Sequence, residues 1–192
     1  MSTIVASEYR SSKIHPKKFG LWIACASITM MFTAFSSAYM VRQAQGNWLE
    51  FNLPNIFFVS TLVIVLSSVT LQGAYLAFKR ENEALYKGLL LATFILGVAF
   101  LILQYEGWLA MRDIGIELTT NPSGSFIYVI SGVHAAHILG GVAALAIALI
   151  HAFVLKYRVT SARKLRFELT LTYWHFVDFL WIYLFIFFML QS

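Results

Sequence analysis

The chain has 192 residues, of which 59% are hydrophobic and only 12% are charged, and its mean hydropathy is +0.73. Soluble domains carry about 25% charged residues, so this composition excludes a soluble globular protein and indicates an integral membrane protein. The net charge of +5 does not indicate a nucleic-acid partner, because the basic residues lie in short segments between apolar runs.

Five apolar runs are long enough to cross a membrane, since a bilayer core about 30 Å thick takes about 20 helical residues. The sequence therefore predicts transmembrane helices over residues 19–41, 56–78, 88–111, 125–155 and 169–190. Lipid offers no partner for backbone amides, and the runs lack the alternation of barrel strands, so we expect an all-α bundle of five helices. Residues 1–18 form a basic leader, and residues 19–192 form a single domain.

The first run could be mistaken for a secretory signal peptide, because it follows a basic leader. Its apolar stretch is longer than the roughly 7–15 residues of a signal peptide, which favours a helix that is retained. The single cysteine, Cys25, lies inside this run, so no intramolecular disulfide is possible.

The distribution of Lys and Arg predicts the orientation. Twelve of these residues lie in the leader, the second-to-third connection and the fourth-to-fifth connection: Arg10, Lys13, Lys17, Lys18, Lys79, Arg80, Lys87, Lys156, Arg158, Arg163, Lys164 and Arg166. Only Arg42 and Arg112 lie on the other side. Because cytoplasmic loops are enriched in basic residues, we expect a cytoplasmic N-terminus and a C-terminus on the outer, periplasmic side.

Ionisable side chains inside the predicted helices are candidate functional residues, since burying a charge in lipid costs about 3 kcal/mol on insertion scales. They are Glu106, His134, His137, His175 and Asp178. His134 and His137 are three residues apart, as are His175 and Asp178, so each pair shares a helical face.

Two interpretations of these residues remain open, a metal or haem site and a structural polar network, and the network is favoured. Two histidines three residues apart cannot be the axial ligands on opposite faces of one haem. Depth in the membrane predicts that Glu106 meets His134. His151 lies close to the cytoplasmic boundary and is expected to be interfacial.

Small residues recur at every fourth position of the fourth run: Gly132, Ala136, Gly140, Ala144 and Ala148. This spacing predicts a close approach to a neighbouring helix. The fifth run is rich in aromatic residues, which we interpret as packing bulk and interface anchors rather than as a quinone or haem cradle.

The last run resembles a known signature. Tyr173, Trp174, His175, Phe176, Val177, Asp178 and Trp181 match the YWHFVD-x-x-W pattern in the last helix of cytochrome c oxidase subunit III. Residues 131–141, with Gly132, His134, His137 and Gly140, are similar to the G-x-H-x-x-H-x-x-x-G stretch of the preceding helix. Tyr105, Glu106 and Trp108, and the segment from Lys18 to Trp22, resemble further elements of the family's short, five-helix bacterial form.

The resemblance implies a cofactor-free accessory subunit of a haem-copper terminal oxidase in the bacterial inner membrane. Haems and copper would lie in partner subunits. The chain would pack against subunit I, meet subunit II and other subunits, hold phospholipid, and support the stability and proton uptake of a proton-pumping complex. One position departs from the family: Ser27 is followed by Ile28, where the short form has an acidic residue associated with proton uptake, and neither Glu106 nor Asp178 occupies that place.

Three alternatives differ in partner or in chemistry. A subunit III-like protein of a nitric oxide reductase shares these motifs. An autonomous membrane cytochrome would bind haem through His134, His137 or His175. A transporter is disfavoured because no predicted helix is broken by paired Gly or Pro at mid-membrane.

Overall fold

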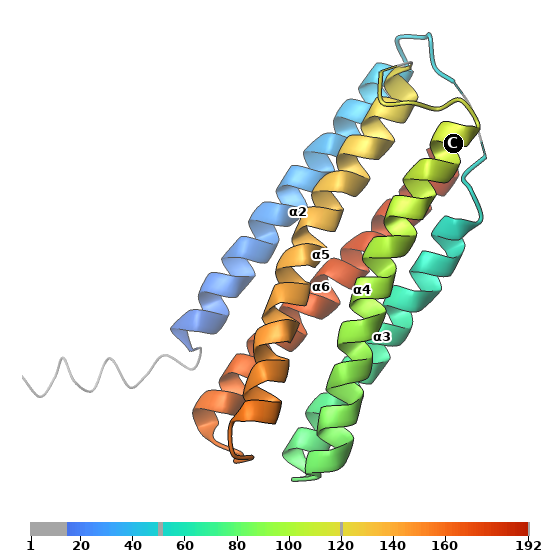
Figure 1. Ribbon diagram of the computed structural model, residues 1–192. Coiled ribbons are helices and arrows are strands. Elements are labelled where there is room, and N and C mark those ends of the chain that lie inside the picture. The colour runs from blue at the N-terminus through green and yellow to red at the C-terminus, as the bar shows by residue number, and fades with distance from the viewer. Residues whose placement is uncertain (1–14, 50–51, 120, 192) are drawn as a thin grey trace, which may run out of the picture.

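The computed structural model describes residues 15–49, 52–119 and 121–191, which form five long helices and contain no strand (Figure 1). The helices are α2 (Pro16–Gln43), α3 (Ile56–Lys79), α4 (Glu83–Asp113), α5 (Pro122–Val154) and α6 (Ser161–Gln191). Each is long and apolar enough to cross a membrane. The predicted all-α bundle of five membrane-spanning helices is confirmed.

The helices close into a ring in the order α2, α5, α4, α3, α6, because each of them contacts the next and α6 also contacts α5. Helix α6 is the most enclosed element: half of its most apolar stretch is buried, and it packs against α2, α3 and α5. Bulky side chains fill the interior, and the largest fully buried ones include Trp174, Trp181, Tyr39, Phe57 and Phe100. The bundle is therefore held by an aromatic core of residues from four helices.

One end of the bundle carries the start of α2 and the connections α3–α4 and α5–α6 (Figure 1). These segments hold the basic residues predicted to share one side of the membrane, so we call this the basic end. Most of the predicted leader, residues 1–14, lies outside the described residues, and residues 16–18 already belong to α2.

Four helices begin earlier than hydropathy predicts, and the difference is largest for α4 and α6. Helix α4 starts at Glu83 instead of residue 88, and α6 starts at Ser161 instead of residue 169. The Asn82 side chain caps α4 by accepting a hydrogen bond from the Leu85 backbone N–H. Hydropathy detects only the part of a helix that lies in lipid, whereas these helices continue with polar residues beyond it.

Candidate functional site

His175 and Asp178 turn their shared face of α6 towards α3. The Nδ1 atom of His175 lies 2.9 Å from Ser68 Oγ, and the Ser68 hydroxyl donates to Asp178 Oδ2. Because a serine hydroxyl has a single proton, and here gives it to Asp178, the Nδ1–H of His175 is the donor to Ser68. One serine thus links the histidine to the carboxylate.

This polar group runs from the interior to the surface of the bundle. Asp178 is 3% exposed, whereas His175 is partly exposed and Gln72 is exposed. The Nε2 atom of His175 lies 3.3 Å from Gln72 Oε1. Ser68 and His175 lie at the middles of α3 and α6, so the hydrogen bonds that join Asp178, Ser68 and His175 cross the bundle wall at half the height of these helices, and Gln72 lies beside the outer edge of the imidazole.

His134 lies in a cage of aromatic rings from three other helices. It is fully buried, and its ring centroid is 6.2 Å from Phe32 of α2, 6.1 Å from Phe100 of α4 and 5.1 Å from Trp181 of α6. Within the described part of the chain, neither ring nitrogen has a hydrogen-bond partner. The edge-to-face contacts with Phe32 and Phe100 are the arrangement that aromatic quadrupoles favour.

His137 is satisfied within its own helix. Its Nδ1 atom lies 2.8 Å from the Val133 carbonyl oxygen, and its ring meets Phe32 edge to face at 5.8 Å. The carbonyl oxygen of His137 accepts a hydrogen bond of 3.0 Å from the Tyr173 hydroxyl, which ties α5 to α6. His137 therefore supports packing, and its imidazole does not join the His175–Asp178 group.

Glu106 does not belong to the interior, which corrects the expectation of a buried Glu106 that meets His134. Its side chain is exposed on the outer surface of α4, beside Tyr105, and the nitrogens of His134 have no polar partner among the described residues. Glu106 and His134 lie at similar depths along their helices, but Glu106 is not on the inward face of α4. That face is formed by Phe100 and Gln104, which are buried.

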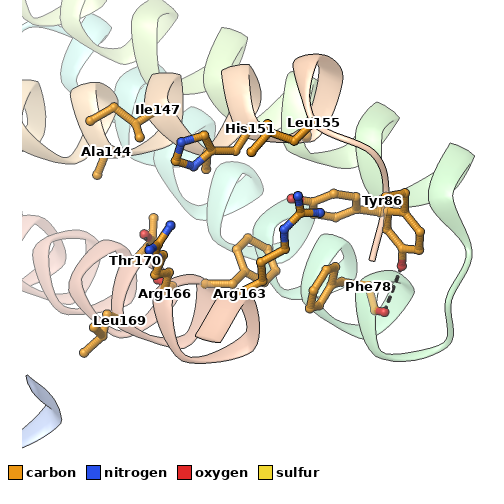
Figure 2. Close-up of a pocket in the computed structure, with 14 residues that line it drawn as sticks. Phe78, Tyr86, Ala144, Ile147, His151, Leu155, Arg163, Arg166, Leu169 and Thr170 are labelled. Carbon is orange, nitrogen blue, oxygen red and sulfur yellow. Dashed lines mark hydrogen bonds between the residues drawn. The ribbon is translucent and has the colours of Figure 1, made fainter. Parts of the chain in front are cut away.

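His151 borders a pocket at the basic end, between the last turns of α5 and the first turns of α6. The pocket has a volume of about 330 Å³. Figure 2 shows His151 facing Arg163 and Arg166 across the opening. Arg163 donates to the Lys156 carbonyl at 2.9 Å, and neither arginine forms a salt bridge with a carboxylate within the described ranges.

The walls of this pocket are mainly apolar away from the arginines. They include Ala144, Ile147, Leu155 and Leu169 (Figure 2). The pocket combines two guanidinium groups at a membrane boundary with apolar walls behind them. It can therefore hold a molecule that has an anionic head and a hydrocarbon chain.

The signature residues of α6 form ties to other helices. Trp174 Nε1 donates to Ser67 Oγ at 2.9 Å, and Trp181 Nε1 donates to Thr61 Oγ1 at 3.0 Å, both in α3. Phe176 lies in a groove between α2 and α6. With Tyr173 bound to α5, the signature joins α6 to α3 and α5.

The small-residue stripe of α5 does not make the close packing that its spacing predicts. Ala136 and Gly140 are exposed, and Gly132 has only Trp108 near it, 4.0 Å from where a Cβ would lie. Two other glycines allow close contacts with Trp174: a Cβ at Gly97 would lie 2.7 Å from this side chain, and a Cβ at Gly141 would lie 2.9 Å from it. The bulk of Trp174, not helix backbone, occupies the space that the glycines leave.

Sequence reasoning missed the residues on α3 that complete the polar group, Ser68 and Gln72. It also missed Glu168, which forms a 2.6 Å salt bridge with Lys18 and accepts a 2.7 Å hydrogen bond from Tyr75, and so joins α2, α3 and α6 at the basic end. The signal that could have found Ser68 and Gln72 was the presence of uncharged polar residues inside an apolar run. In the residues that the structure describes, no three His, Cys, Asp or Glu side chains gather as a metal-binding group.

The sequence matches the family described as Cytochrome c oxidase subunit III over residues 14–192. Relatives include the cytochrome c oxidase subunit 3 of Corynebacterium diphtheriae, 30% identical with 82% of this chain and 79% of the relative covered. A probable cytochrome c oxidase subunit 3 of Nocardia farcinica is 33% identical, with 86% and 82% covered. The cytochrome bo(3) ubiquinol oxidase subunit 3 of Buchnera aphidicola is 27% identical, with 89% and 92% covered. With five membrane-spanning helices, and with the signature residues of α6 tying the bundle together, this chain belongs to the cytochrome c oxidase subunit III family of the haem-copper oxidases, and it is a multi-pass membrane component of an oxidase complex.

Proposed function

We propose that this chain is the accessory, cofactor-free subunit III of a bacterial inner-membrane terminal oxidase. It packs against subunit I, while the haems and copper are held by partner subunits. Family membership across residues 14–192 is the observation that carries the proposal. The three candidate haem ligands support it, because His134, His137 and His175 face three different surroundings instead of one cavity.

Co-purification tests this function. The complex is extracted from native membranes in mild detergent through a tag on this chain, and the co-eluting proteins are identified by mass spectrometry. We expect a haem-copper subunit I and subunit II, with all haem absorbance assigned to partners. Nitric oxide reductase subunits in their place would refute the oxidase assignment, and a stoichiometric Soret band from the isolated polypeptide would refute the cofactor-free one.

The chain also holds a phospholipid, and the pocket at the basic end is its site. Arg163 and Arg166 supply charge at the boundary, and the walls behind them are apolar. An anionic headgroup at two guanidinium groups gains charge-assisted hydrogen bonds, and its acyl chain covers the apolar wall.

Lipid retention tests this part of the proposal. Arg166→Gln lowers the anionic phospholipid that stays with the purified complex, measured by native mass spectrometry. Arg158→Gln is the matched control, because Arg158 is exposed on the adjacent α5–α6 connection but does not line the pocket. Equal lipid in both variants would exclude the pocket as the site.

Support of subunit I includes stability and proton uptake. Ile28, which stands where the family has a carboxylate, packs against the bundle core and has no ionisable group. The contribution to proton uptake therefore comes from the charged basic end, where Lys18, Arg163 and Arg166 lie. Proton-uptake rates of the complex with and without this subunit test it: removal should slow uptake, and an unchanged rate would leave only a stabilising role.

A further inference from the structure

A polar patch interrupts the outward surface of α3 and α6. Gln72 is exposed, and His175 beside it is partly exposed. Gln72 lies about four residues from the middle of α3, or about 6 Å along the helix axis. The hydrocarbon extends about 15 Å from its midplane, so the Gln72–His175 patch lies well inside it.

Hydrocarbon cannot satisfy this patch. A glutamine amide offers two N–H donors and a carbonyl acceptor, and among the described residues its one polar side-chain contact is with His175 Nε2, at 3.3 Å. Polar groups in lipid are disfavoured unless a protein group satisfies them, and they usually face a neighbouring helix. The remaining hydrogen-bonding capacity of Gln72 therefore points to a protein neighbour.

The line of hydrogen bonds behind the patch holds it in place. Asp178 accepts from Ser68, Ser68 accepts from His175 Nδ1, and the opposite nitrogen of His175 faces Gln72. The buried carboxylate thus fixes the imidazole through Ser68, and the exposed amide of Gln72 lies beside this fixed ring.

The surroundings of the patch have the shape and chemistry of a helix-docking face. Val65, Val69 and Leu76 of α3 are exposed around Gln72, and Phe179 of α6 is 72% exposed one turn from His175. Beyond Phe179, a groove of about 570 Å³ runs between α6 and α2. The outward surface of α4 differs at its middle, where the exposed residues Leu91, Ile95 and Ile102 are apolar and suit lipid; its exposed carboxylate, Glu106, lies about 12 Å from the middle, towards the outer end.

We infer that the α3–α6 face centred on the Gln72–His175 patch docks a transmembrane helix of the oxidase's larger membrane-embedded subunit, through an apolar helix that carries a hydrogen-bonding side chain at the depth of Gln72. The inference rests on the proposed function and adds to it which face of the bundle makes the contact.

Photo-crosslinking in native membranes tests the face. The photoreactive amino acid p-benzoylphenylalanine replaces Val69, which is 64% exposed one turn from Gln72, or, as the control, Ile95, which is 57% exposed on α4. We expect at least about tenfold more crosslinking to another membrane protein from position 69. Equal or greater protein crosslinking from position 95, or no protein adduct from position 69, overturns the inference.

Identification of the adduct separates this inference from the proposed function. A position-69 adduct with the haem-containing subunit supports both. An adduct with a different membrane protein overturns the inference as stated and counts against the proposed function too. An oxidase that co-purifies intact but gives no adduct at position 69 overturns the docking face alone.

A substitution tests the hydrogen bond itself. Gln72→Leu keeps the size of the side chain and leaves the Asp178–Ser68–His175 links in place. We expect the fraction of this subunit retained on the complex after a stringent detergent wash to fall several-fold, with an unchanged amount of the subunit in the membrane. Ile95→Leu is the control and retains the wild-type fraction. Equal retention in the two variants overturns the role of Gln72.

Discussion

The contact between Trp174 and the two glycines predicts that a single methyl group destabilises the bundle. A Cβ at Gly97 would lie 2.7 Å from Trp174 Cη2 and 3.1 Å from its Cζ2. Carbon atoms pack best at about 3.5–4.0 Å, so the first contact is about 1 Å too short. The indole cannot easily retreat, because it is fully buried, its Nε1 is bonded to Ser67, and its other edge rests against Gly141.

The magnitude follows from two opposing terms. Overpacking of this kind costs about 1–3 kcal/mol. Replacing a helical glycine by alanine gains up to about 1 kcal/mol of backbone free energy. Gly88→Ala in the same helix has the second term without the first, since a Cβ there meets nothing within 4 Å. Gly97→Ala should therefore be about 1–3 kcal/mol less stable than Gly88→Ala.

Unfolding of the purified chain in mixed detergent micelles, followed by circular dichroism, measures this difference. The comparison between the two alanine variants cancels the shared backbone gain and isolates the contact with Trp174. If Gly97→Ala proved as stable as Gly88→Ala, Trp174 could not be confined in the way that we argue.

Three further predictions concern ionisable residues. Asp178→Leu should lower the amount of assembled complex, because it removes the buried acceptor of Ser68 at a cost of about 1–3 kcal/mol, while Asp178→Asn keeps an acceptor and should be milder; normal complex yield in Asp178→Leu would contradict this. Glu106→Gln should leave assembly and pumping close to wild type, since Glu106 is exposed; a normally assembled complex that failed to pump would assign Glu106 a functional role. Glu168→Gln should cost less than about 1 kcal/mol and lose that effect in high salt, because Lys18 is 40% exposed; a salt-independent loss would argue against the ion pair.

The five helices were predictable because hydropathy measures the property that the bilayer selects. Their ends were not, because a helix continues into water wherever caps and polar residues sustain it. The first turns of α6 contain Arg163 and Arg166, which hydropathy assigns to a loop. Helical geometry places them beside His151 and creates the pocket at the basic end.

For the candidate site, the sequence predicted only how deep each residue lies in the membrane. Sequence position gives the depth of Glu106 and His134, but the direction of each side chain around its helix depends on which face packs inward. The same reasoning explains the glycines: the stripe through Gly132 and Gly140 has a regular spacing, but the bulky partner, Trp174, lies against Gly97 and Gly141.

The signature of α6 combines residue types that suggest chemistry, yet their contacts distribute them around the helix as structural ties. Tyr173 binds the α5 backbone, Trp174 and Trp181 donate to hydroxyls of α3, and Tyr183, two residues farther on, donates to Ser36 of α2 at 3.0 Å. In lipid, each of these donors would otherwise lack a partner. Each neighbouring helix must therefore supply an acceptor at one defined position along its axis. A run of polar aromatic residues in a membrane helix therefore fixes the register and rotation of that helix. The His175 line, which ends at the exposed Gln72, is the member of this set that extends the same requirement to a neighbouring protein.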